Sequence, residues 1–188
     1  GAWEKTTWRE YRDAVRQAAR ALVATGVEPG QGVVILAFNR PEWFVANLAT
    51  ISAGGRPAGI YTNSTPEQCR YITEHAEAVV AVVENHASLE RLQAAGGRPP
   101  GLKAIVLMDG EATEPGVLTW KDFPARGKDT HDAEADRRTA AATPTTKPTT
   151  PPTTAPPSDP GITPTEIRLA VIADDQDIVK GVQAWAAN

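Results

Sequence analysis

Residues 32–37 read GVVILA, a glycine and five apolar residues with no polar residue between them. An unbroken apolar run of this length is typical of a strand that is buried on both faces of a parallel sheet. Residues 39–42 (NRPE) come next and predict a helix start, because Asn39 can cap a helix and Pro41 fits the first turn. The inward stripe of that helix is expected to be Phe44, Leu48 and Ile51.

The same alternation extends in both directions from this unit. Thr7 and Glu10 have the spacing of a capping box, and Thr65 and Gln68 repeat it, so a helix is expected to begin after each threonine. A further helix is expected around residues 87–95. The other expected strands are residues 57–61, 79–83 and 103–107. Strands that alternate with helices predict an α/β fold with a parallel sheet and right-handed crossovers.

The character of the chain changes near residue 127. We expect a folded domain at residues 1–126, a disordered Thr/Pro-rich linker at 127–165 and a short βα tail at 166–188. Proline donates no backbone hydrogen bond and threonine offers little apolar area, so the linker cannot build a core. In the tail, residues 167–172 are expected to form a strand and residues 176–187 a helix.

Composition narrows the classes of partner and compartment. The formal net charge is −4 with no stripe of Lys and Arg, which argues against a nucleic acid partner. We recognise neither a signal peptide nor an apolar run of the roughly 18–20 residues that a transmembrane helix needs. Cys69 is the single cysteine of the chain, so we expect a reducing compartment and a cytoplasmic protein.

An ordered series of segments carries a family resemblance. Residues 3–126 resemble the N-terminal part of bacterial AMP-forming long-chain acyl-CoA synthetases, members of the adenylate-forming superfamily. The resemblance is specific because the segments occur in the same order along the chain; any single segment would be weak evidence for the family. The segments that carry it are residues 39–43, 53–61, 64–72, 75–78, 82–85, 102–106 and 116–120.

The resemblance implies a partial N-terminal domain of the adenylate-forming fold. It also implies a family reaction in which fatty acid, ATP and coenzyme A give acyl-CoA, AMP and pyrophosphate, with Mg²⁺ as cofactor. In that family the phosphate loop, the Mg²⁺-binding Glu and the catalytic Lys all lie beyond the region matched here. The Thr-rich stretch has Pro where a phosphate loop needs Gly. No catalytic, cofactor-binding or metal-binding residue can therefore be assigned, and we expect this chain to be inactive alone.

The tail carries a second and shorter resemblance. Residues 167–176 are similar to the start of a response-regulator receiver domain, in which an acidic pair helps to bind Mg²⁺. Asp174 and Asp175 would be that pair. Two adjacent carboxylates supply only part of a Mg²⁺ site, and the chain ends before the third strand on which the family carries its phosphorylated Asp. We interpret the pair as a solvated acidic turn or helix start.

Other chemistry-bearing residues are interpreted as structural. Cys69 shares the inward face of a helix with Ile72 and has no His at nucleophile spacing, so we interpret it as a core thiol. His75, His86 and His131 show no metal-ligand spacing with one another or with Cys69.

Three hypotheses follow for the whole chain. The first is a truncated long-chain fatty acid–CoA ligase without activity of its own. The second is a non-enzymatic interaction module with a stalk and a docking tail. The third is a truncated response regulator joined to an unrelated fragment. Under the first hypothesis we also expect an open edge and an uncovered sheet face, hence marginal stability and self-association.

Overall fold

A computed structural model describes residues 5–130, 138 and 166–167. Five of its strands form one parallel sheet in the order β3-β2-β4-β5-β6. This arrangement confirms the predicted α/β class. The strands are β2 (Gly32–Leu36), β3 (Arg56–Gly59), β4 (Ala78–Val83), β5 (Ala104–Leu107) and β6 (Val117–Thr119).

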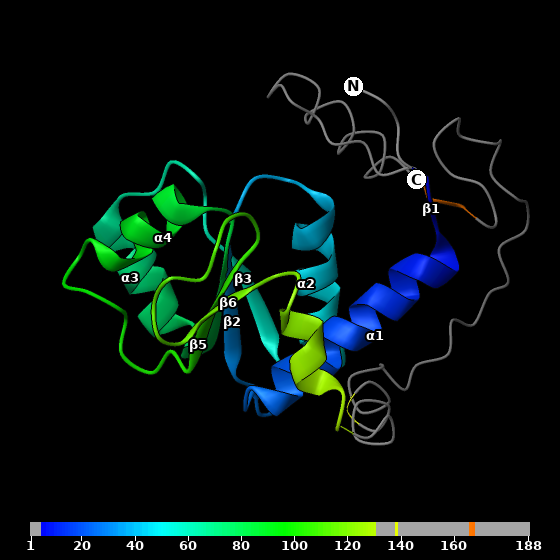
Figure 1. Ribbon diagram of the computed structural model, residues 1–188. Coiled ribbons are helices and arrows are strands. Elements are labelled where there is room, and N and C mark those ends of the chain that lie inside the picture. The colour runs from blue at the N-terminus through cyan, green and yellow to red at the C-terminus, as the bar shows by residue number, and fades with distance from the viewer. Residues whose placement is uncertain (1–4, 131–137, 139–165, 168–188) are drawn as a thin grey trace, which may run out of the picture.

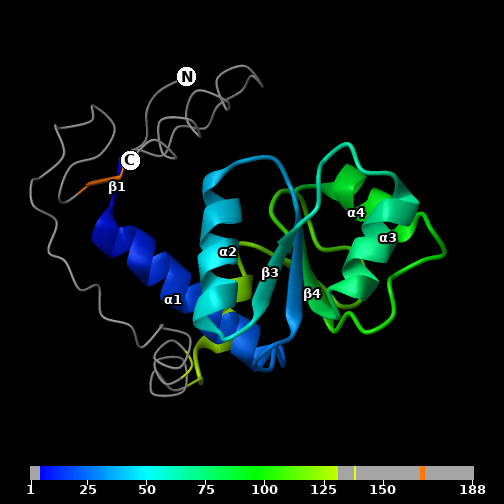
Figure 2. The same ribbon diagram turned by 180° about the vertical axis from the view of Figure 1, so that it is seen from behind.

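Helices cover both faces of this sheet. Figures 1 and 2 show α1 and α2 on one side of the strands and α3 and α4 on the other. The short 3-10 helix η1 packs on α1, and its residue Phe123 is buried in the core that α1 and α2 share. The helices are α1 (Trp8–Ala24), α2 (Pro41–Ser52), α3 (Pro66–His75), α4 (His86–Gln93) and η1 (Phe123–Gly127).

The strand residues alternate between two apolar cores. Val33 and Ile35 of β2 point into the core beneath α1 and α2, whereas Val34 and Leu36 point into the core beneath α3 and α4. Every residue of β2, β4 and β5 is buried. Because both faces of these strands are apolar, the sequence shows the unbroken runs that predicted them.

The predicted starts of α1, α2 and α3 are all confirmed, with Pro41 in the first turn of α2 as expected, but the expected cap of α2 is wrong. Thr7 and Thr65 each accept a hydrogen bond from the backbone of the residue three positions on, and the side chains of Glu10 and Gln68 reach back, which completes both capping boxes. Asn39, expected to cap α2, does not do so. The N-cap position is Arg40, whose guanidinium has no acceptor for a backbone N–H and instead donates to Glu42 and Asp109.

The orientation predicted for α2 is also wrong. Phe44, Leu48 and Ile51 were expected to face inward, but their exposed fractions are 40%, 38% and 41%. The residues that α2 buries are smaller: Val45, Ala46, Ala49 and Thr50. Small inward residues let α2 approach α1 closely, since α1 likewise presents Ala18, Ala19 and Ala21 to the shared core.

The expected uncovered sheet face is wrong for the described residues, because helices lie on both faces. Edge strands do remain at β3 and β6, and at β3 the outward-pointing residue Pro57 has no N–H group to donate. A proline at this position blunts a strand edge against pairing with another strand. Contact with another molecule through backbone pairing at β3 is therefore disfavoured.

Most of the expected linker and tail lie outside the described residues. Within them, η1 ends at Gly127, one residue past the expected domain boundary of 126, and Gly127 is buried against α1. Two residues near the start of the expected tail strand, β7 (Glu166–Ile167), pair antiparallel with β1 (Thr6–Thr7).

Candidate functional site

The carboxyl ends of β2 and β4 form the first region to consider for function. From β2 the chain moves to β3 on one side and later returns to β4 on the other side. Open α/β sheets bind ligands at such a switch point, outside the carboxyl ends of the strands. The residues that directly follow β2 and β4 in the chain lie at this switch point; they are Ala37 to Arg40 and Glu84 to Asn85. Asp109 follows the neighbouring strand β5.

Arg40 is the centre of a charged network at this edge. Its Nε donates to Glu42 Oε2 at 2.8 Å and its Nη2 donates to Asp109 Oδ1 at 3.1 Å. A second bond from Nη1 to Asp109 makes that pair bidentate. Only 19% of the Arg40 side chain is exposed, whereas Asp109 is 60% exposed. Arg40 therefore ties the start of α2 to the segment after β5.

Glu84 adds a second tie across the same edge. Its Oε2 accepts a hydrogen bond of 2.7 Å from the backbone N–H of Phe38, and its carbonyl oxygen accepts one of 2.8 Å from the N–H of Asp109. The segments that follow β2, β4 and β5 are thus joined by side-chain and backbone bonds. This network holds the switch point in one conformation.

The electrostatics of the network agree with a structural role. The bonds from Arg40 hold the pKa of Asp109 below its ordinary value, against a smaller opposing effect of burial. The bonds to Asp109 and then Glu42 raise the pKa of Arg40. A guanidinium that already pairs with two carboxylates has little capacity left for a phosphate. We therefore interpret Arg40 as a residue that positions loops.

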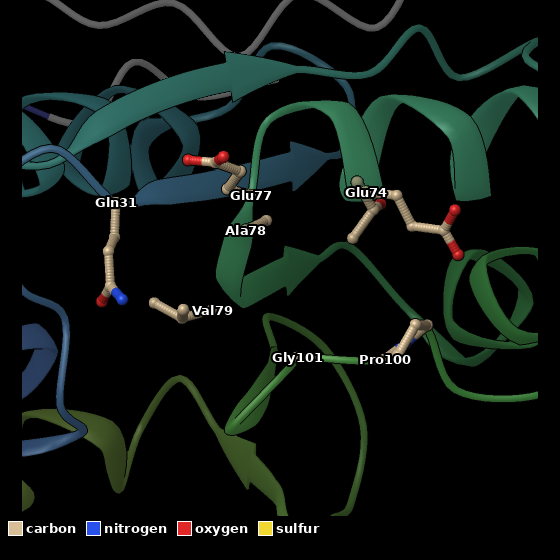
Figure 3. A pocket seen from close by; sticks show the side chains of 8 residues that line it. Gln31, Glu74, Glu77, Ala78, Val79, Pro100 and Gly101 are labelled. Carbon is tan, nitrogen blue, oxygen red and sulfur yellow. The ribbon is translucent and has the colours of Figure 1, made fainter.

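A cavity of about 330 Å³ lies at the opposite, amino-terminal end of the sheet (Figure 3). Glu74 and Glu77 contribute its charged groups, and each pairs with an arginine, Glu74 with Arg70 at 2.9 Å and Glu77 with Arg56 at 3.3 Å. Gln31, Thr73, Ala78, Val79, Pro100 and Gly101 complete the lining. Both glutamates of this cavity are paired, and the cavity lies away from the switch point. Its lining residues therefore form no group of side chains suited to catalysis.

The residues singled out from the sequence are not brought together. Cys69 is buried on α3, and burial raises the pKa of its thiol, as expected for a core cysteine. His75 stacks on Tyr71, with ring centroids 5.5 Å apart, and His86 opens α4. No group of three potential metal ligands occurs in the part of the chain that the structure describes. His131, Asp174 and Asp175 lie outside that part.

Sequence reasoning missed the Arg40 network, although a signal was present. Glu84 and Asp109 each stand immediately or shortly after a buried strand, so both residues are expected at the carboxyl edge of a parallel sheet. Arg40 and Asp109 are 69 positions apart, so the pairing itself follows only from the order of the strands. That order cannot be derived from local patterns.

Comparison with known proteins decides the family. The profile of the AMP-binding enzyme family matches residues 1–160. This chain belongs to the AMP-binding enzyme family. The match extends past the folded domain expected at 1–126 and covers most of the expected linker.

Curated relatives of this AMP-binding chain are long-chain fatty acid–CoA ligases. The long-chain-fatty-acid–CoA ligase ACSBG2 of Xenopus laevis is 38% identical over 144 residues, which are 76% of this chain and 20% of the relative. The ligase heimdall of Drosophila melanogaster is 38% identical over 124 residues, or 63% of this chain and 18% of the relative. The chain thus spans about a fifth of the length of the relatives that it matches.

Solved structures show the same fold. The anthranilate CoA ligase AuaEII, in complex with anthranoyl-AMP, superposes with a TM-score of 0.57 and 27% identity over 62% of this chain and 22% of that chain. The acetoacetyl-CoA synthetase of Streptomyces lividans gives a TM-score of 0.55 and 26% identity over 63% of this chain and 20% of that chain. The five-stranded sheet is therefore a part of the adenylate-forming CoA ligase architecture.

Two finer sequence interpretations gain no support. The curated relatives reported above are animal proteins, so the comparisons do not support a bacterial origin. They do not support the receiver-like tail either, because the family match ends at residue 160. Among the described residues, no helix combines the length and apolarity needed to cross a bilayer.

Proposed function

We propose that this chain supplies the N-terminal structural part of a long-chain fatty acid–CoA ligase. In this proposal it contributes a doubly wound sheet and positions its switch point, and it carries no group for the chemistry of ATP. Fatty acid, MgATP and coenzyme A are the substrates of the complete enzyme. Residues of the family that lie beyond the matched fifth act on them.

One observation carries this proposal. At the carboxyl edge of the sheet, where a ligand would bind, Arg40 pairs with Glu42 and Asp109, and Glu84 accepts from the backbone N–H of Phe38. Residues 37–40, 84–85 and 109, the described residues placed at this edge above, contain no cation besides Arg40 and no glycine-rich loop. A site built in this way holds a scaffold together and leaves the binding of phosphate to other residues.

The remaining expectations stay proposals. A reducing compartment, such as the cytoplasm, suits the buried thiol of Cys69, the single cysteine of the chain. The interaction module is not favoured, because the family match and the curated relatives are those of ligases. Self-association also stays a proposal, and Pro57 disfavours it at the β3 edge of the sheet.

An exchange of segments tests the proposal. The matched residues of this chain replace the aligned segment in the Xenopus laevis relative, and pyrophosphate release is measured with palmitate, MgATP and coenzyme A. Because the segment would be structural, we expect the folded chimera to keep its fatty-acid-dependent activity within about tenfold of the unaltered relative. A folded chimera without fatty-acid-dependent activity would contradict the proposal.

A further inference from the structure

Arg138 lies well past the sheet domain in the sequence and yet bonds to two of its loops. Its Nη1 donates to the carbonyl oxygen of Val27 at 2.8 Å and to that of Ala53 at 3.5 Å. Its Nη2 lies 3.6 Å from Oε2 of Glu28, and only 14% of the Arg138 side chain is exposed. A guanidinium so far withdrawn from water is held by its partners, so these contacts belong to the fold.

The two carbonyl acceptors belong to loops that meet at one end of the sheet. Val27 lies between α1 and β2, and Ala53 is the C-cap residue of α2. The backbone already joins these loops, because the N–H of Gly30 donates to the carbonyl oxygen of Gly54 at 2.8 Å. Both loops precede strands, so they lie at the amino-terminal end of the sheet, opposite the switch point. Arg138 adds a side-chain clamp at this junction.

The ends of α1 and α2 also need a positive charge that their own sequences do not supply. Neither helix has a basic residue in its last turn. The last carbonyl groups of a helix have no partner within it, and its C-terminus carries a partial negative charge that a cation stabilises. Lys103 donates to the carbonyl oxygen of Gly26, just past α1. Arg138 supplies a second cation there, and its several N–H groups reach the end of α2 as well.

We propose that Arg138 is a latch that clamps the end of α1 to the end of α2, and that the folding unit of this chain therefore extends to residue 138. The unit then ends beyond the boundary at residue 126 that the sequence predicts. Because its contacts lie at the amino-terminal end of the sheet, the latch does not involve the switch point. The inference is independent of the proposed function.

An ion pair with Glu28 alone is the weaker explanation for the contact. The Glu28 side chain is 64% exposed and its oxygen is 3.6 Å from the guanidinium. Pairs exposed to water in this way contribute little to stability. The bond to the carbonyl oxygen of Val27 is much shorter, at 2.8 Å. We therefore assign the anchoring to the carbonyl groups, and the experiment separates the two explanations.

Hydrogen exchange of the full 188-residue chain, followed by mass spectrometry, tests the latch. We expect Arg138→Ala to speed exchange by at least about fivefold in the peptides that cover the ends of α1 and α2, since both ends lose a shared donor and open more often. Arg137→Ala is the matched control, because it removes the same charge from the neighbouring position. It should leave exchange at both ends within about twofold of the native rate.

Glu28→Gln separates the carbonyl groups from the ion pair. It removes the carboxylate and keeps both carbonyl acceptors, so exchange at the helix ends should again stay within about twofold of the native rate. Acceleration as large as that of Arg138→Ala would assign the contact to the ion pair and overturn the latch. Equal exchange in Arg138→Ala and Arg137→Ala would overturn it as well.

A second pair of variants covers the case in which Arg138→Ala fails to fold. Arg138→Lys is then compared with Arg137→Lys in the same measurement. Lysine keeps the charge but has a single amino group in place of the planar fork that reaches both loops. We expect faster exchange at the helix ends in Arg138→Lys only, and equal exchange in the two variants would overturn the inference.

Discussion

Gly32, at the start of β2, shows how a single residue fixes the contact between two parts of the fold. A Cβ atom placed on Gly32 would overlap the carbonyl oxygen of Ala76, the residue that caps α3. The backbone of β2 thus passes the end of α3 at a distance that only glycine permits. Because the obstacle is backbone, it cannot be relieved by rotating a side chain.

We predict that Gly32→Ala lowers the free energy of unfolding by about 1–3 kcal/mol, the usual range for overpacking a core. Gly59→Ala is the matched control, because its Cβ would meet Trp43 at an ordinary contact distance of 3.5 Å. Urea unfolding followed by circular dichroism measures both. Equal effects of the two substitutions would show that the contact between β2 and α3 is not tight.

Arg40 is the second residue with a structural role that can be measured. We predict that Arg40→Ala costs about 1–2 kcal/mol of unfolding free energy, because it leaves Asp109 and Glu42 without their shared donor. Arg56→Ala is the control, since the pair of Arg56 with Glu77 is exposed on both sides, and such pairs contribute about 0–1 kcal/mol.

The contribution of Arg40 should also depend on pH. Asp109 has a pKa below its ordinary value of 3.8 because Arg40 donates to it. A lowered folded-state pKa stabilises the fold above the unfolded-state value, and this stabilisation is lost as pH falls through the folded-state value. The difference between the native chain and Arg40→Ala should therefore shrink as pH falls below 3.8. A difference that stays constant into that range would contradict the pairing.

At the scale of elements, the helices differ in how they begin. Helix α3 begins with a complete capping box at Thr65, whereas α2 begins at Arg40 without a side-chain cap. We predict that Thr65→Ala costs about 1 kcal/mol of unfolding free energy, because a backbone N–H loses its acceptor. Asn39→Ala should change it by less than about 0.5 kcal/mol, as at other exposed sites. A larger effect at Asn39 than at Thr65 would reverse this assignment of caps.

The elements also show why some predictions succeeded. The strand expected at residues 79–83 lies within β4, because a run of apolar, mostly β-branched residues leaves no alternative that is equally compact. The prediction of the orientation of α2 failed because apolar residues lie on both sides of the helix, so periodicity alone could not distinguish the inner face from the outer. The packing of its alanines on α1 decided the orientation, and that contact is not local in sequence.

At the scale of the whole molecule, the described residues form one sheet with a core on each side. Sequence patterns predicted this class and the family, because the motifs occur in order along the chain. They did not predict that helices cover both faces of the sheet, nor that η1 packs on α1 nearly a hundred residues earlier. Our central proposal is that this folded part is a structural part of a ligase and performs no ATP chemistry by itself.

Fatty-acid-dependent pyrophosphate release by the 188-residue chain alone tests that claim most directly. The chain is incubated with palmitate, MgATP and coenzyme A, and the Xenopus laevis relative serves as the positive control. We predict that the chain releases no more pyrophosphate than a sample without palmitate, because the described charged groups at its switch point already bond to other groups of the fold. Release above that background, abolished when palmitate is omitted, would contradict the account.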